Sequence, residues 1–127
     1  MRFTESEATR MAMKLKISLP DFYQMYTRKQ GRGANSWREL KEVKVEGKRG
    51  WYDCVFLDRE TQPGKALCLL YEERPLQCKT WPFWPDILET PKSWELAAKG
   101  AEGCAGIGKG DTVSFENIVR QRDDPGL

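Results

Sequence analysis

The scarcity of aliphatic side chains is the feature that most constrains how this chain can fold. Leu, Ile, Val and Phe together account for 25 of its 127 residues, a share at the lower edge of what folded domains use. Five Trp and four Tyr add large buriable surfaces, and the formal net charge is only +2. We therefore expect a folded chain with one modest core, supplemented by aromatic rings.

The sequence has four cysteines and no histidine, which excludes several kinds of chemistry. A Ser-His-Asp or Cys-His nucleophile pair, a two-histidine zinc finger, an H-E-x-x-H metalloprotease helix and a His-ligated haem all need the missing residue. Metal or redox chemistry in this chain must therefore use sulfur and carboxylate ligands. A net charge of +2 does not favour nucleic acid as a partner, and no apolar run of about 18 residues is present to span a membrane.

The amino-terminal residues carry no recognisable targeting signal. Residues 1–7 turn acidic at Glu5 and contain no apolar stretch, so they predict neither a signal peptide nor a transit peptide. We expect an intracellular, cytoplasmic protein. In a reducing compartment, four cysteines more often bind metal or act in redox chemistry than form disulfides.

Capping patterns predict helices in the first third of the chain. Thr4-x-x-Glu7 is a capping box, with Phe3 and Ala8 spaced as a hydrophobic staple. Helical spacing then continues through Ala8, Met11, Ala12 and Leu15. A second helix is predicted from the cap Ser18 to a point before Gly31, with a buried stripe of Phe22, Met25 and Tyr26.

Short strands follow in the middle of the chain. Residues 42–46 alternate Val with Glu and Lys, which predicts an exposed strand, and residues 51–57 and 66–71 predict two more. If the last two form a hairpin that closes near Leu57 and Ala66, Cys54 lies opposite Leu69. Cys54 and Cys68 are then neighbours.

The remainder alternates short helices with irregular segments. Arg74-Pro75 predicts a helical turn that carries Cys78, whereas the prolines of residues 81–85 exclude regular structure. Thr90-Pro91 predicts a helix that Gly100 stops. A last helix is expected to turn Phe115, Ile118 and Val119 inward. The fold class is therefore α+β, a small irregular domain over residues 1–120 with a polar tail over 121–127.

The cysteines have the spacing C-x13-C-x9-C-x25-C, without the paired C-x2-C knuckles of zinc ribbons. Each lies at a strand, a turn or a glycine-rich loop, where backbone amides can hydrogen-bond a thiolate. Four thiolates would satisfy a tetrahedral zinc ion or an iron–sulfur cluster. The alternatives are four separate buried thiols and disulfides in any of three pairings.

Several segments together resemble the YkgJ-like family of zinc- or iron-chelating cysteine-cluster proteins. The resemblance runs from Phe3 to about Asp111. Its carriers are the helical stretch 4–26 and the segments 54–58, 68–71, 74–85 and 104–108, of which R-P-x-x-C-x-x-[aromatic]-P-F after C-x-x-Y is the most specific. The resemblance implies that Cys54, Cys68, Cys78 and Cys104 correspond to the family's metal-chelating cysteines. Members of that family carry a C-x-x-C-x-x-C-C type stretch just before the segment that matches Phe3, where this chain has Met1-Arg2.

Other motifs are weaker signals. The Trp-rich segment 81–85 can be a stacking platform for a ligand or single-stranded nucleic acid, but we interpret it as an aromatic lid over the cysteines that supplements the core. Residues 103–109 match G-x4-G-K of a phosphate loop, yet Gly110 replaces the required Ser or Thr and the preceding segment predicts a helix rather than a strand. We interpret Arg74 as a residue that ties down a carbonyl or a carboxylate.

We therefore expect a metal-chelating protein in which Cys54, Cys68, Cys78 and Cys104 hold zinc, iron or an iron–sulfur cluster, with a structural or electron-transfer role. No catalytic residue is predicted. One alternative is a redox or methyl-transfer enzyme component, because the resemblance extends to the cysteine clusters of flagellin lysine methylases. Another is a metal-free interaction module or a truncated remnant.

Overall fold

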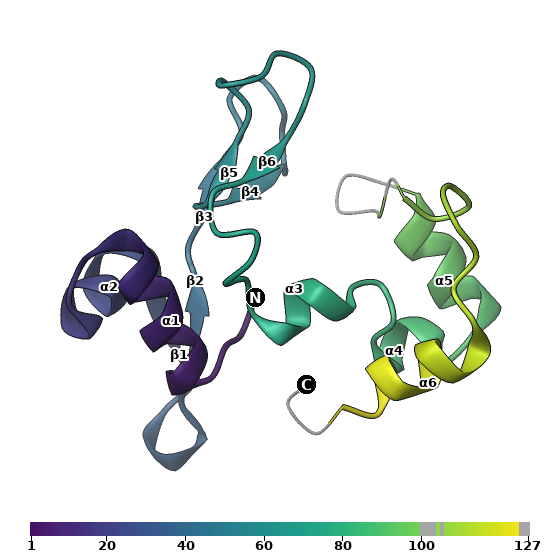
Figure 1. Ribbon diagram of the computed structural model, residues 1–127, viewed down its shortest axis with the longest axis horizontal. Helices are drawn as coiled ribbons and strands as arrows, with labels where there is room; N and C mark the ends of the chain where they lie inside the picture. Colours follow the sequence, from purple (N-terminus) through teal and green to yellow (C-terminus); the bar gives the residue numbers. More distant parts are fainter. Residues whose placement is uncertain (100–103, 105, 125–127) are drawn as a thin grey trace. The chain divides into compact units, whose positions relative to one another are not determined.

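The computed structural model describes residues 1–99, 104 and 106–124. The chain divides into two compact units, residues 1–75 and 76–127, which are traced from purple to teal and from teal to yellow in Figure 1. Helices combine with antiparallel two-stranded sheets, so the α+β class is confirmed. The single domain expected over residues 1–120 stays a prediction.

Helices α1 (Glu5–Leu15) and α2 (Leu19–Tyr26) begin where their caps predict. The Thr4 hydroxyl accepts the Glu7 amide hydrogen at 3.3 Å, and the Thr4 amide donates to the Glu7 carboxylate at 2.7 Å. This reciprocal pair satisfies amides that the first helical turn leaves unbonded. The Ser18 hydroxyl does the same for the Asp21 amide at 3.2 Å, and both predicted helix starts are confirmed.

The predicted buried stripe of α2 is partly wrong. Phe22 is fully buried and Tyr26 half-buried, but Met25 is 53% exposed. The ring of Phe56 explains the difference, because its centroid lies 6.3 Å from Phe22 and 4.9 Å from Tyr26. Phe22 and Tyr26 are four residues apart, so they lie on one face of the helix, and this face contacts Phe56. Met25 lies beside that face.

A hairpin that the sequence analysis missed follows α2 directly. Strand β1 (Thr27–Gln30) pairs with β2 (Trp37–Leu40) in antiparallel register, Thr27 opposite Leu40. Gly31 makes the turn possible: its φ is +74°, and a Cβ there would lie 2.3 Å from the Asn35 carbonyl oxygen. Three polar residues in β1 hide the alternation that identifies most strands.

Four short strands follow, and their pairing corrects the predicted hairpin. β3 (Glu42–Lys44) is exposed, as predicted, and pairs with β4 (Tyr52–Cys54). β5 (Leu57–Asp58) pairs with β6 (Leu67–Cys68), and Leu57 lies opposite Cys68 rather than Ala66. The strand expected over residues 51–57 is thus two strands, because Phe56 turns into the core at 3% exposure and interrupts the ladder. Cys54 is opposite Glu42, not Leu69.

The hydrophobic core of the described residues lies within residues 1–75. It combines one face of α1 and Phe22 of α2 with single residues from the strands and from the segment after β6. Its buried members are Ala8, Met11, Ala12, Phe22, Leu40, Phe56 and Leu70. Phe3 and Tyr26 pack against this cluster, and their rings meet those of Phe22 and Phe56 in edge-on, tilted or stacked pairs. The predicted contribution of aromatic rings to a thin core is confirmed.

Residues 76–127 form short helices joined by irregular segments. They are α3 (Leu76–Thr80), α4 (Pro85–Leu88), α5 (Pro91–Ala98) and α6 (Phe115–Arg122). α3 carries Cys78 as predicted, and the Thr90 hydroxyl caps α5 by accepting the Ser93 amide hydrogen at 3.0 Å. The expected helix stop at Gly100 and the end of the tail, residues 125–127, lie outside the described residues.

The inward face predicted for the last helix is partly wrong. Ile118 and Val119 are half-buried, but Phe115 is 74% exposed. Ser114 is the N-cap of α6, so Phe115 is the first helical residue. A side chain at this position has no preceding turn to cover it.

Candidate metal centre

Two of the four cysteines lie at the ends of short strands in residues 1–75, one in each of two separate two-stranded sheets. Cys54 ends β4, and Cys68 ends β6 directly opposite Leu57 of β5. Both are half-buried and pack against the core cluster that contains Phe56. The Leu69 amide donates to the Phe56 carbonyl at 2.9 Å, which extends the β5–β6 pairing toward Cys54. The two thiols are close enough for Cys68 to raise the pKa of Cys54.

Burial and hydrogen bonding act in opposite directions on the Cys54 thiol. Burial raises its pKa above the ordinary value, a hydrogen bond from the Phe56 backbone lowers it, and the neighbouring Cys68 raises it further. The net direction is upward, because removing the thiolate from water costs more than one amide hydrogen bond returns. The metal-free Cys54 is therefore a neutral thiol around neutral pH.

The other two cysteines belong to residues 76–127. Cys78 is half-buried in α3. Cys104 follows α5, and its amide donates to the Ala97 carbonyl at 2.7 Å while its carbonyl accepts the Ile107 amide hydrogen at 3.2 Å. These two bonds hold Cys104 between the end of α5 and the turn that follows it. Neither pair of cysteines forms a disulfide in this structure.

The donor chemistry of these residues fits zinc or iron, since four thiols that are not in disulfides supply the soft ligands that both metals accept. The amide donated to the Cys54 sulfur is the kind of outer hydrogen bond that stabilises a ligating thiolate. Within residues 1–99, 104 and 106–124, no group of three or more cysteine or carboxylate side chains is already gathered to hold a metal ion.

Charged residues near the cysteines in sequence are engaged in local contacts. The Arg59 guanidinium makes a two-pronged ion pair with Asp53, at 2.6 and 2.8 Å, and lowers the pKa of that carboxyl. Arg74 donates to the Tyr71 carbonyl and lies over the Tyr71 ring. The prediction that Arg74 ties down a carbonyl is confirmed.

The Trp-rich segment packs on its own unit. Trp81 and Trp84 meet edge to face at 4.7 Å, and the Trp84 indole N–H donates to the Gln77 carbonyl at 3.0 Å. Phe83 stacks on Trp94 of α5. These contacts agree with the predicted role of the segment in supplementing the packing, while its role as a lid over a metal stays a prediction.

The phosphate-loop match is a false positive, as predicted. Helix α5 precedes residues 103–109 where a phosphate loop needs a buried strand, and the next helix begins only at Phe115. Cys104 and residues 106–109 instead line a cavity that the sequence did not predict. The Trp and glycine content of this region was its only sequence signal.

The fold and the thiols together define a small α+β protein with a cysteine-only set of candidate metal ligands. The chain belongs to the CxxCxxCC family, described as "Putative zinc- or iron-chelating domain", whose model matches residues 2–105. The expected family resemblance is confirmed. No solved structure matches the chain. No helix in the described residues is long and apolar enough to cross a membrane.

Proposed function

We propose that this protein chelates zinc or iron through Cys54, Cys68, Cys78 and Cys104 and that the bound metal has a structural or electron-transfer role. The observation that carries the proposal is that Cys54 of β4 and Cys68 of β6 pack against the same core, close enough for Cys68 to raise the pKa of Cys54, in a chain of this family. Two adjacent thiols are half of a tetrahedral all-sulfur ligand set. Cys78 and Cys104 supply the other half.

The chain's own residues prepare the thiols for ligation. β4 and β6 hold Cys54 and Cys68 against the core, which reduces the entropy lost when the ligands are ordered. The hydrogen bond from the Phe56 backbone lowers the energy of the Cys54 thiolate. A bound zinc ion would supply a cross-link between ligands, and an iron–sulfur cluster would also supply a one-electron couple.

Protons compete with the metal for Cys54. Because burial raises the pKa of its thiol, ligation must displace a proton that is held more tightly than in an exposed cysteine. Metal affinity therefore rises with pH until the thiol is ionised. The same burial slows oxidation of the metal-free thiol, because the thiolate is the form that reacts with oxidants.

Elemental analysis of protein purified without oxygen tests the proposal. We expect close to stoichiometric zinc or iron, and each of the variants Cys54→Ser, Cys68→Ser, Cys78→Ser and Cys104→Ser should lower metal affinity by at least about tenfold, because a hydroxyl is a poor ligand for either metal. Thr80→Ser is the matched control: it alters α3 beside Cys78 but leaves every thiol in place, and should retain the metal.

A content of zinc plus iron below about a tenth of an equivalent would contradict the proposal. So would four cysteine variants that all keep wild-type metal content. Visible charge-transfer absorbance indicates an iron–sulfur cluster with an electron-transfer role, whereas a colourless zinc protein indicates the structural role.

A further inference from the structure

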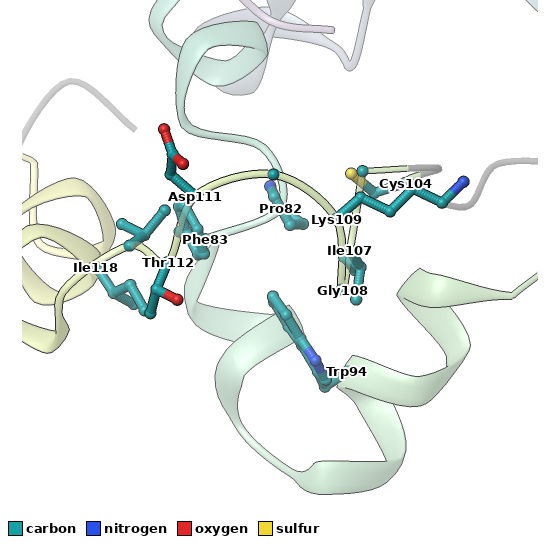
Figure 2. Close-up of a pocket in the computed structure, with 13 residues that line it drawn as sticks. Pro82, Phe83, Trp94, Cys104, Ile107, Gly108, Lys109, Asp111, Thr112 and Ile118 are labelled. Atoms are coloured by element: carbon teal, nitrogen blue, oxygen red, sulfur yellow. The ribbon is translucent and has the colours of Figure 1, made fainter.

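A cavity of about 480 Å³ lies within residues 76–127. Figure 2 shows that Trp94 of α5 forms its floor, that Pro82 and Phe83 close one side, and that the loop after Cys104 forms the opposite side. Ile118 of α6 completes it. Its volume falls within the range of about 300–1,000 Å³ that small-molecule sites occupy.

The walls of this cavity are mainly apolar and aromatic. The ring of Phe83 stacks on that of Trp94, at 12° between planes with centroids 6.2 Å apart, which fixes the orientation of both rings in the wall. Ile107 and Ile118 add aliphatic surface. A flat aromatic molecule would gain both apolar burial and ring contact here.

The charges on the lining cancel. Lys109 and Asp111 contribute one positive and one negative charge, and Figure 2 shows their charged ends at opposite outer edges, directed away from Trp94. The lining therefore offers neither sign of charge to a ligand. Burying a charged group against Trp94 and Ile107 would cost desolvation energy without compensation, so a neutral ligand is favoured.

Glycines keep the loop side of the cavity open. A Cβ at Gly108 or Gly110 would meet no atom within 4 Å, so open space lies beside both. A Cβ at Gly106 would meet only the Cys104 sulfur, at 3.7 Å. Cys104 therefore lies at the edge of the cavity, next to the place where a side chain at position 106 would extend.

We propose that this cavity binds a small, neutral, planar aromatic molecule that lies against Trp94 and covers the Cys104 thiol. The inference goes beyond metal chelation. Cys104 is the one residue used here that is also a proposed metal ligand, so binding is tested on the metal-free protein. It assigns Cys104 a second role, as a contact for the bound molecule.

The first test needs no variant and uses N-phenyl-1-naphthylamine, a neutral aromatic probe whose fluorescence rises when it leaves water. On the metal-free, reduced 127-residue chain we expect saturable binding of one probe per chain. Bound probe should slow alkylation of Cys104 by iodoacetamide by at least about threefold, because the probe covers the thiol. Cys78, in the same unit but not in the cavity lining, should react at an unchanged rate.

Two variants locate the binding. Gly106→Phe adds a ring at the cavity edge without removing a contact, since an added Cβ there would lie at an ordinary van der Waals distance from the Cys104 sulfur. This variant should weaken probe binding by at least about tenfold. Leu96→Glu is the matched control: it changes an exposed side chain of α5 outside the lining and should leave binding unchanged.

Equal protection of Cys104 and Cys78, or none, would overturn the proposal even if Gly106→Phe failed to fold. Loss of binding in Leu96→Glu would indicate adsorption to exposed surface and would overturn it as well. Failure of metal binding, measured separately, would leave these outcomes unaffected.

Discussion

At the scale of single residues, burial and a backbone hydrogen bond act in opposite directions on the ionisation of the Cys54 thiol. Its position at the end of β4 buries the thiol against the core, which favours the neutral form, while the Phe56 backbone donates a hydrogen bond that favours the thiolate. A fully buried thiol without this bond would be inert. The arrangement keeps Cys54 protonated in the metal-free protein, and under the proposed function a metal ion would replace the proton.

The raised pKa of Cys54 predicts a measurable difference between folded and unfolded protein. In the metal-free folded chain, the pH midpoint for alkylation of Cys54 should lie above the midpoint for the same residue in denaturant, because burial in the native state penalises the thiolate. Mass spectrometry of iodoacetamide-treated samples across a pH series measures both midpoints. A folded midpoint equal to or below the unfolded one would show that the hydrogen bond from Phe56 outweighs burial.

At the scale of elements, local signals decided where helices begin but not which strands pair. Thr4, Ser18 and Thr90 each cap a helix at the predicted residue, because a cap bonds to amides only two or three residues away. Strands of two to four residues have no comparable local signal. Their ends depend on contacts such as that of Phe56 with Phe22 and Tyr26.

Substitutions on the two faces of α2 should differ in how much they destabilise the protein. Phe22→Ala should destabilise the protein by about 3–5 kcal/mol, because it removes a fully buried ring and leaves a cavity among Phe3, Tyr26 and Phe56. Met25→Ala, on the same helix, should change stability by less than about 0.5 kcal/mol, since its side chain is exposed. Urea denaturation followed by circular dichroism compares them, and similar losses in both variants would contradict the assignment of the buried face.

At the scale of the whole molecule, apolar burial is distributed unevenly. The described hydrophobic core cluster lies entirely in residues 1–75, whereas the buried residues described in 76–127 are Thr80, Pro82 and Ala97. Stacked and edge-to-face rings supplement this second unit. With so little burial to offset the entropy of ordering, residues 76–127 are expected to open more readily than the first unit.

Metal binding should therefore stabilise the second unit more than the first. If Cys78 and Cys104 ligate zinc, adding zinc to the reduced metal-free protein should slow amide hydrogen exchange in α3 and α5 by at least about tenfold, because ligand binding stabilises only the closed state. Amides of α1, within the larger core, should change less. Hydrogen-exchange mass spectrometry measures both, and Cys78→Ser should abolish the difference.

An equal effect on α1 and α5 would contradict the expected difference in stability between the two units. Slower exchange that persists in Cys78→Ser would instead indicate that zinc acts through other groups.

Prediction from sequence succeeded where a residue acts on its near neighbours and failed where distant residues share one contact. Phe115 was expected to be buried from its apolar character, but the cap at Ser114 places it in the first turn, where it is exposed. The β1–β2 hairpin was missed because Arg28, Lys29 and Gln30 carry no apolar alternation, although Gly31 marks its turn. The cavity beside Cys104 was missed because its walls come from residues 11 to 35 positions apart, such as Phe83, Trp94 and Ile118.

By itself, the sequence determined the family, the starts of α1, α2 and α5, and the sulfur and carboxylate groups that this chain, without histidine, can offer a metal, since each depends on residue type or on spacing within a few positions. Tertiary structure alone decided the strand register, the burial of Cys54 and Cys68 against one core, and the cavity at Cys104. The physical reason is that packing is cooperative. Phe56 fills the space beside Phe22 and Tyr26, which are distant in sequence, and its position limits where the strands on either side of it can pair.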